Sequence, residues 1–310
     1  MQIKWQFIFL IASLVITGPS HRNYVGAATA AKWHLVWQDN FAKPGHPDPA
    51  KWSDERGFVR NKEPQYYQPG NAVVRGGMLV IEARKQRVAN RQYRRGAKNW
   101  RYARKWAQYT SASLTTLGKE SWLYGRFEMR AKLPAGAGMW PAFWLLGTDI
   151  SKVGWPECGE IDVMEWLGRE PRVIHTTVHW EGGHHTHQSQ ARLFTLHSSA
   201  AKKFHTYRMD WSPKHITFYI DGTKYFTFNV SAAGTGADNP FRKRMYLILN
   251  LAMGGNWAGP INNKALPAKY EIRYIRVYQR QAAQASGQHS PHPPAQKSPD
   301  RHVGKASARR

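Results

Sequence analysis

Apolar and polar residues alternate with a period of two along much of the chain, and this pattern indicates strands. In residues 122–133 the apolar residues Phe127 and Met129 are two positions apart and would lie on the same face of a strand. Residues 204–211 and 269–278 alternate in a similar way. No stretch has a convincing helical period. Many short strands separated by Gly, Pro and Asn turns favour an all-β fold built as a two-sheet sandwich.

Residues 215–228 contain the signal of a β-hairpin. Two strand-like stretches, 215–220 and 223–228, flank the dipeptide Asp221-Gly222. This dipeptide is favoured in the type I′ turn, whose twist matches that of the flanking strands. We therefore predict an antiparallel pair here.

Three carboxylates, Glu160, Asp162 and Glu165, lie within six residues of a largely apolar, strand-like run that follows Glu157 in the stretch 157–166. In a regular strand Glu160 and Asp162 share one face, whereas Glu165 points to the other. A β-bulge at Val163-Met164 would absorb one residue and return Glu165 to the face of the other two acids. The two Glu backbones would then be roughly 13 Å apart, and side chains that lean together could bring the carboxyls to about 5 Å.

Two carboxyls at that separation fit glycoside hydrolysis with retention of configuration. We predict that Glu160 is the nucleophile and that Glu165 is the general acid and then the general base. Asp162 adds a negative charge that should hold a proton on a neighbouring acid. The alternative is that the acids form the solvent face of an amphipathic strand. Nearby tryptophans argue against it, because an exposed face rarely carries so much aromatic surface; they are Trp140, Trp144, Trp155 and Trp166.

The run 159–165 resembles the active-site signature of glycoside hydrolase family 16. It is most similar to that of the laminarinase-like endo-β-1,3-glucanases, whose motif has the extra residue that lichenases lack. Other matching stretches follow in order between residues 33 and 279, at 35–41, 63–67, 79–84, 124–128, 139–144, 249–257 and 275–278. The resemblance implies a β-jelly roll with a concave substrate cleft. It also implies an endo-acting retaining hydrolase that needs no cofactor and cleaves β-1,3-glucan or mixed β-1,3/1,4-glucan.

Substrate-binding residues follow from the same resemblance. Flat aromatic faces against sugar rings are expected from Trp140, Trp144 and Trp155, with Trp257 at the rim. Hydrogen bonds to sugar hydroxyls are expected from Asn61 and His179. Core roles for the tryptophans and a structural role for the histidine remain open at this point.

The sequence departs from the family pattern at three places. Many relatives bind calcium with an acid before the Phe of the first strand and an Asp in the last strand, where this chain has Asn40 and Arg273. A cation there would lose a ligand and meet a positive charge, so we predict no metal at that site. Ser113 replaces an arginine of the family and removes one expected contact to the sugar.

Other substrates and functions stay open. Enzymes that cleave sulfated galactans also have a bulged motif, but a sulfate-binding cleft needs Arg or Lys within it. The residues that flank the acids in sequence are mainly aromatic and neutral, which favours a neutral glucan. Glucan transglycosylation passes through the same glycosyl-enzyme. A non-catalytic glucan-binding protein is less favoured, because such relatives typically lose the glutamates.

The 310 residues carry a net charge of +25, and ten basic residues without one acid lie between Arg84 and Lys105. Aromatic residues interleave with them, a pattern that nucleic-acid-binding segments share. An exported enzyme rarely meets nucleic acid, so we expect a solvated loop between two strands. The functional option is contact with an anionic cell surface or an acidic polysaccharide.

The two ends differ in composition from the middle. Residues 1–30 have the pattern of an export signal, with an uncleaved membrane anchor as the alternative, so we expect a secreted or periplasmic protein. Residues 31–280 are expected to form the catalytic domain, and residues 281–310 a disordered basic tail. We expect a monomer.

A nucleophilic or metal-binding role is not expected for the cysteine or the His-rich loop. The lone Cys158 is interpreted as a small buried residue, because a thiol mechanism would need a His partner. His184, His185 and His187 are interpreted as chance enrichment in a variable loop, since a metal would need ligands on rigid supports.

Overall fold

The computed structural model describes residues 32–280. The predicted export signal at 1–30 and basic tail at 281–310 lie outside these residues. Within the described range, no helix has the length and apolar character that a membrane span requires.

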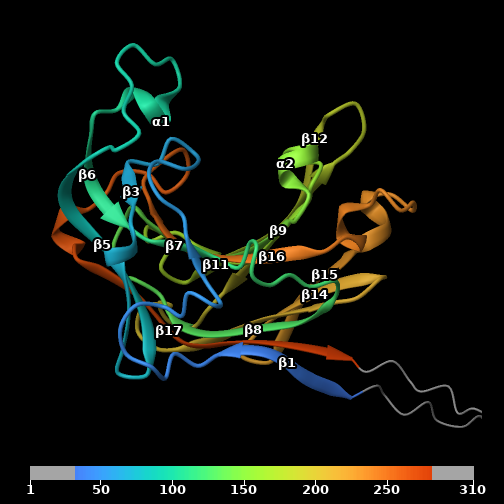
Figure 1. Cartoon of the computed structure of the whole chain (residues 1–310). Helices are drawn as coiled ribbons and strands as arrows, with labels where there is room; N and C mark the ends of the chain where they lie inside the picture. Colours follow the sequence, from blue (N-terminus) through green and yellow to red (C-terminus); the bar gives the residue numbers. More distant parts are fainter. Residues whose placement is uncertain (1–31, 281–310) are drawn as a thin grey trace, which may run out of the picture. The chain divides into compact units, whose positions relative to one another are not determined.

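The described residues form two sheets, and the larger has ten strands (Figure 1). Its order is β15 (Thr223–Asn229), β14 (His215–Ile220), β13 (His205–Trp211), β8 (Gly125–Lys132), β17 (Ala268–Arg280), β5 (Met78–Ala89), β6 (Trp106–Ser111) and β3 (Gln65–Tyr67). Two further strands join it, β1 (Trp33–Asp39) on β17 and β4 (Ala72–Arg75) on β5.

The smaller sheet has seven strands and carries the acidic motif. Its order is β12 (His187–Thr195), β11 (Val173–Glu181), β10 (Glu160–Trp166), β9 (Met139–Gly147), β16 (Met245–Met253), β7 (Ser113–Thr115) and β2 (Ser53–Asp54). The only α-helices within 32–280 are the four-residue α1 (Trp100–Ala103) and α2 (Ile150–Val153). Short 3₁₀ turns occur elsewhere in this range, at Pro69–Asn71, Val230–Ala233, Pro240–Arg242 and Asn263–Ala265. The prediction of an all-β jelly-roll sandwich is confirmed.

The main core lies between the two sheets. Strand β8 shows the predicted alternation, with Phe127 and Met129 buried in this core and the residues between them partly exposed. In the smaller sheet β9 and β16 are buried at every position. Phe143 belongs to the main core, whereas Trp144 belongs to a second apolar cluster on the opposite face. The smaller sheet is therefore apolar on both faces, and the second face is available to line a cleft.

Two local predictions are confirmed by the backbone. In β10 the pairing with β11 passes from Asp162 opposite Thr177 to Glu165 opposite His175, which leaves one extra residue in β10. This is the β-bulge expected at Val163-Met164. The hairpin of β14 and β15 turns at Asp221 and Gly222, whose φ values of 48° and 85° are those of a type I′ turn.

Two local expectations are wrong. Residues 84–89 of the basic run are not part of a loop, because β5 continues through them to Ala89, and the true connection is 90–105. His187 does not lie in the His-rich loop, because it is the first residue of β12 and pairs with Glu181 of β11. In both places exposed polar residues hid a strand that backbone pairing holds in place.

Replacement of Gly147 by Ala should destabilise the domain. An added Cβ at Gly147 would lie 2.1 Å from the carbonyl oxygen of Cys158, so the backbone just before β10 would have to move. Overpacking of this kind costs about 1–3 kcal/mol, or roughly 2–4 °C in melting temperature per kcal/mol for a domain of this size. Thermal unfolding followed by circular dichroism measures the change.

Gly70 is the matched control, because no atom lies within 4 Å of its added Cβ and its φ is not positive. Gly70→Ala should change stability by less than about 0.5 kcal/mol. Equal melting temperatures for Gly147→Ala and Gly70→Ala would contradict the steric argument.

Candidate active site

A cavity of about 510 Å³ lies on the face of the smaller sheet that points away from the main core. Its lining includes Glu160, Asp162 and Glu165, together with Asn61, Trp140, Trp144 and Trp155. The structure thus brings the three acids and four of the six predicted substrate-binding residues to one place. His179 and Trp257 are not in the lining.

The bulge in β10 determines how the acids share this cavity. Val163 and Met164 both pack in the main core, so the face that β10 presents to the cavity resumes at Glu165. Asp162 and Glu165 are buried, and Glu160 is partly buried. The predicted common face therefore exists, and it is the buried apolar face of the sheet.

Burial changes the protonation of all three acids. Burial and the neighbouring Asp162 raise the pKa of Glu160 to about 8. Burial raises the pKa of Asp162 as well, and burial together with Asp162 raises the pKa of Glu165 well above its usual range. Three carboxylates so close cannot all be ionised near neutral pH. The cluster therefore retains protons, so that one carboxyl can act as an acid beside an ionised one.

Indole N–H groups hold two of the acids. Trp140 Nε1 donates to Glu165 Oε1 at 2.9 Å, and Trp155 Nε1 donates to Glu160 Oε2 at 3.0 Å. Trp155 is 46% exposed, which leaves its ring free to meet a sugar, whereas Trp140 is buried. These two tryptophans position the carboxyls as well as line the cavity.

The third tryptophan, Trp144, contacts Asn250, another residue of the cavity lining, and not one of the three acids. It is buried, and its Nε1 donates to Asn250 Oδ1 at 2.7 Å. Asn250 in turn donates to the Tyr67 hydroxyl, which donates to Glu63. Trp140 and Trp144 thus each belong to an apolar cluster and also line the cavity, and contact of their rings with a sugar stays a prediction.

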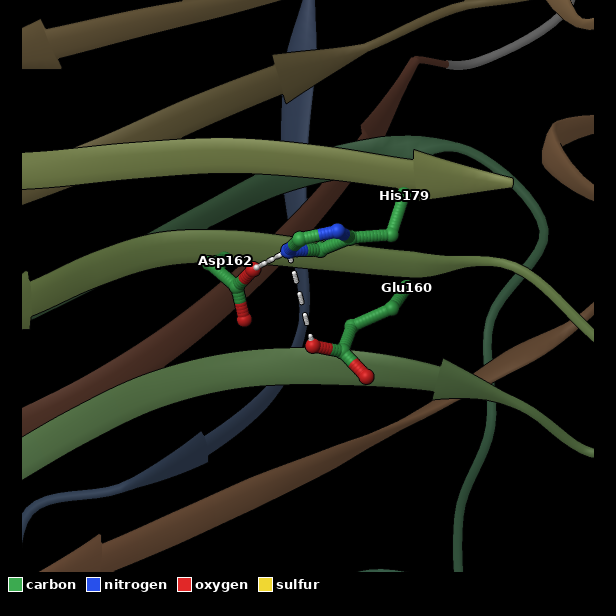
Figure 2. A group of neighbouring side chains, drawn as sticks. All are labelled: Glu160, Asp162 and His179. Atoms are coloured by element: carbon green, nitrogen blue, oxygen red, sulfur yellow. Dashed lines mark ion pairs between the residues drawn. The ribbon is translucent and has the colours of Figure 1, made fainter. Parts of the chain in front are cut away.

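His179 lies beside the acids and is directed to them from β11. Its Nε2 is 3.2 Å from Asp162 Oδ2 and 3.9 Å from Glu160 Oε1 (Figure 2). The other ring nitrogen, Nδ1, lies 2.8 Å from Nε2 of His187. The His187 ring also packs against Trp155, with centroids 4.6 Å apart. His187 therefore supports two groups that contact Glu160, a role that the sequence analysis missed because it depends on the pairing of β11 with β12.

Trp257 lies behind Trp140 and not in the cavity lining. Its ring meets that of Trp140 edge-on at 5.2 Å, and that of His175 at 5.0 Å on another side. His175 is in turn 3.0 Å from Glu170. Trp257 thus supports the indole that holds Glu165, and its place at the rim of the substrate cleft stays a prediction.

Asn61 lines the cavity as expected, in a left-handed backbone conformation with φ of 53°. Its side-chain amide donates to Glu63 Oε1 at 3.3 Å. Glu63 also accepts from Gln65 at 2.6 Å, and burial raises its pKa. The partners of Asn61 in this polar wall come from the stretch 63–67, which the sequence analysis names only as a match to the family.

Two arginines line the cavity, which corrects the expectation of a mainly aromatic and neutral surrounding. Arg60 forms an ion pair with Glu55, and its guanidinium lies 5.0 Å from the centre of the Trp144 ring. Ser113, which replaces the arginine of the family, donates to the same Glu55. Arg101 belongs to α1. Neither arginine is near the acids in sequence, so local pattern could not place them.

Glu160, Asp162 and His179 form the one group of acids and histidines within residues 32–280 that could surround a metal ion, with ligand atoms within 4.8 Å of one another. The prediction of no metal concerned a different place. There Asn40 is exposed, and the Arg273 guanidinium lies over the Phe204 ring at 4.6 Å. Burial raises the pKa of the Cys158 thiol to about 12, so this buried cysteine is a poor nucleophile.

Glu160→Gln should stabilise the protein at alkaline pH. The pKa of Glu160 rises from 4.5 to about 8 on folding. Between these values the folded state binds more protons than the unfolded state, so the free energy of unfolding falls as pH rises. Glutamine cannot ionise, and the variant should melt above the wild type beyond pH 8, with little difference near pH 4.5.

Melting temperatures across this pH range provide the measurement, with Glu120→Gln at an exposed position as the control. A difference between Glu160→Gln and wild type that stays constant with pH would argue against a raised pKa.

Comparison with known proteins identifies the family. Residues 67–276 match the model for glycosyl hydrolases family 16. The chain is 40% identical over 263 residues to a beta-glucanase of Rhodothermus marinus, and the match covers 80% of this chain and 86% of that enzyme. It is 32% identical to a keratan-sulfate endo-1,4-beta-galactosidase of Sphingobacterium multivorum, covering 79% of this chain and 55% of that enzyme.

Among solved structures, the laminarinase catalytic domain of Thermotoga maritima superimposes with a TM-score of 0.70 and 36% identity. That match covers 81% of this chain and 99% of the other. The fold, the bulged acidic strand and the sequence matches agree over the same residues. The chain belongs to glycoside hydrolase family 16 and is a retaining endo-glycosidase.

Proposed function

We propose that this protein hydrolyses β-1,3-glucan or mixed β-1,3/1,4-glucan within the chain. The observation that carries the proposal is the row of three acids on one strand, in a cavity walled by tryptophan, with indole N–H groups on Glu160 and Glu165. The similarity to a beta-glucanase and a laminarinase supports the glucan backbone as substrate.

In this mechanism Glu160 attacks the anomeric carbon while Glu165 protonates the departing glycosidic oxygen. The C–O bond to the leaving sugar breaks as the bond to Glu160 forms. Glu165, now ionised, then takes a proton from water, which attacks the same carbon and releases Glu160. The raised pKa of Glu165 suits the first step, because this carboxyl must enter it protonated.

The depth of burial separates the roles of the two glutamates. Both accept an indole N–H, both are affected by His179, and the charge of Asp162 opposes the ionisation of both. Glu165 is buried whereas Glu160 is partly exposed, so Glu165 is the carboxyl whose pKa is raised further and that keeps its proton. An ionised nucleophile beside a protonated acid is the state that the first step needs.

Export to the periplasm or the medium is part of this proposal, because a polymeric substrate cannot enter a cell intact. The apolar run near the N-terminus is the feature that supports it. Transglycosylation differs from hydrolysis only in the acceptor that reaches the glycosyl-enzyme, and water is the more abundant acceptor when no second glucan chain is bound.

Product analysis tests the substrate class. Purified protein incubated with laminarin, lichenan, carrageenan and agarose should release glucose oligomers of several lengths from laminarin or lichenan, with the β-anomer formed first. Chromatography and proton NMR of the early products give both results. Release of galactose-containing oligomers with laminarin untouched would favour the sulfated-galactan alternative, and no release from any polymer would favour a binding protein.

Removal of the two carboxyls should have the same effect on turnover but a different effect on the product formed with azide. Glu160→Ala and Glu165→Ala should both reduce turnover on laminarin by several orders of magnitude, on the scale typical for catalytic groups. Azide can occupy the space of a lost carboxyl. With Glu160→Ala it should attack the anomeric carbon directly and give an α-glycosyl azide, whereas with Glu165→Ala and an activated aryl glycoside it should give the β-product.

The anomeric configuration of the azide product, measured by NMR, therefore assigns the roles independently of fold stability. An α-product from Glu165→Ala would exchange the two roles. Activity within tenfold of wild type for either variant would remove that residue from the mechanism.

His187→Phe tests the support of His179. Phenylalanine keeps an aromatic ring beside Trp155 but removes the 2.8 Å contact to Nδ1 of His179. Loss of one hydrogen bond costs about 0.5–1.5 kcal/mol, so kcat on laminarin should fall roughly 3- to 10-fold with KM little changed. His187→Gln, which can restore the bond, should recover most of kcat, and equal kcat for the two variants would assign His187 a packing role only.

A further inference from the structure

Residues 90–105, here called the basic arm, connect β5 to β6 and carry α1. In Figure 1 the arm rises beyond the end of β6, and α2 stands across the smaller sheet from it. No acidic residue occurs between 83 and 119. The cations of the arm are Arg91, Arg94, Arg95, Lys98, Arg101, Arg104 and Lys105.

Packing gives the basic arm a defined conformation. Trp100 meets Phe58 with ring centroids 5.9 Å apart, at the edge of a small apolar cluster. The side-chain amide of Asn90 donates to the carbonyl oxygens of Arg101 and Arg104, at 2.8 Å each. Asn99 caps α1 by accepting from the N–H of Arg101. The backbone that carries the cations of the arm is therefore held in place.

One of these cations, Arg101, borders the catalytic cavity. The other arginine of the lining, Arg60, has its charge compensated by Glu55. Arg101 forms no ion pair with any acid in the described part of the chain. The cavity thus has a cluster of acids in one part and an uncompensated guanidinium in another.

A second cavity, of about 460 Å³, lies next to the arm and has no acid in its lining. Arg56 and Arg91 line it together with Tyr66 and Gln68. Neither arginine pairs with a carboxylate among residues 32–280. Glu55 lines the catalytic cavity while the next residue, Arg56, lines the second, so the two cavities lie on either side of one segment.

We propose that the basic arm and Arg56 extend the substrate-binding surface and bind sulfate or carboxylate groups carried by the glucan chain. The inference rests on the proposed function, because the acids would cleave the neutral backbone while the arm binds substituents away from the scissile bond. A guanidinium binds either group through two parallel hydrogen bonds. Contact with an anionic cell surface would not require Arg101 to border the catalytic cavity. A charged polysaccharide that also enters this cavity is therefore the partner that fits the basic arm better.

The test compares laminarin with the same laminarin after light carboxymethylation. The readout is the ratio of kcat/KM on the charged substrate to kcat/KM on the neutral one, so that any blocking effect of the substituents cancels between variants. Arg101→Gln should lower this ratio on the order of tenfold, as expected for loss of one charge-assisted hydrogen bond. The double variant Arg56→Gln/Arg91→Gln should lower it as well.

Arg192→Gln is the matched control, because Arg192 is exposed on the edge strand β12 and forms no ion pair with an acid in residues 32–280. It should leave the ratio at the wild-type value. For the wild type, the ratio should fall as salt rises from about 10 mM to several hundred mM, because salt screens exposed charges.

A ratio that is the same in Arg101→Gln as in Arg192→Gln would overturn the inference while leaving laminarin hydrolysis intact. An inactive wild type on both laminarins, with activity on a sulfated galactan, would instead overturn the proposed function. Binding to vesicles with phosphatidylglycerol that is lost in the Arg101→Gln and Arg56→Gln/Arg91→Gln variants, with an unchanged hydrolysis ratio, would assign the arm to a cell surface and also overturn the inference.

Discussion

The burial of three carboxyls on one strand is the constraint on which the site depends. Moving a carboxylate from water into an apolar surrounding without a partner costs several kcal/mol, and proteins usually respond by keeping the group protonated. Here Glu160 and Glu165 each accept an indole N–H, and Asp162 lies near His179. These partners offset part of the cost of burying the charges. The rest is avoided because the raised pKa values keep carboxyls of the cluster protonated. A stable apolar sheet is needed to hold this cluster together.

The smaller sheet meets that need because it is packed on both faces. Main-core side chains such as Phe143 fix its inner face, while Trp144 and Tyr246 form an apolar floor on the other. Each large side chain buried in this way contributes about 1.5–3 kcal/mol. The bulge in β10 is compatible with this packing because Val163 and Met164 both enter the core. One extra residue thus aligns Glu165 with the other acids while both residues of the bulge stay in the core.

Local pattern was sufficient where neighbours in sequence specify the structure. The alternation in β8, the turn at Asp221-Gly222 and the β-bulge in β10 were predictable, the last from the spacing of its acids. Pattern failed at β9 and β16, which are buried throughout and have no alternation to detect. It also failed at residues 84–89, where exposed charges follow a strand whose stability comes from pairing with β6 and not from its own composition.

The carboxyls were predictable as a group, but their supporting residues were not. Trp257 and His187 act through Trp140 and His179, contacts that exist only once distant segments are paired. The same holds for Arg60, whose ion pair with Glu55 is local but whose stacking on Trp144 is not. A sequence motif can predict which groups take part in the chemistry. The geometry of those groups depends on contacts between strands that are distant in sequence.

The positive charge of the chain and the acids of the site act over different distances. Several exposed arginines lie over aromatic rings, as Arg87 does over Trp106 at 3.8 Å and Arg94 over Tyr102 at 5.2 Å. Neither of these two arginines forms an ion pair with an acid in residues 32–280, but exposed charges are screened beyond about 10 Å at 0.1 M salt. The protonation of Glu160 and Glu165 is therefore set by burial, by Asp162 and by the nearby His179, while the net charge of +25 acts on what approaches the molecule from outside. An acidic catalytic cluster and a basic exterior are thus compatible in one domain. Burial raises the pKa values of the acids, whereas solvent and salt screen the exposed positive charges from them.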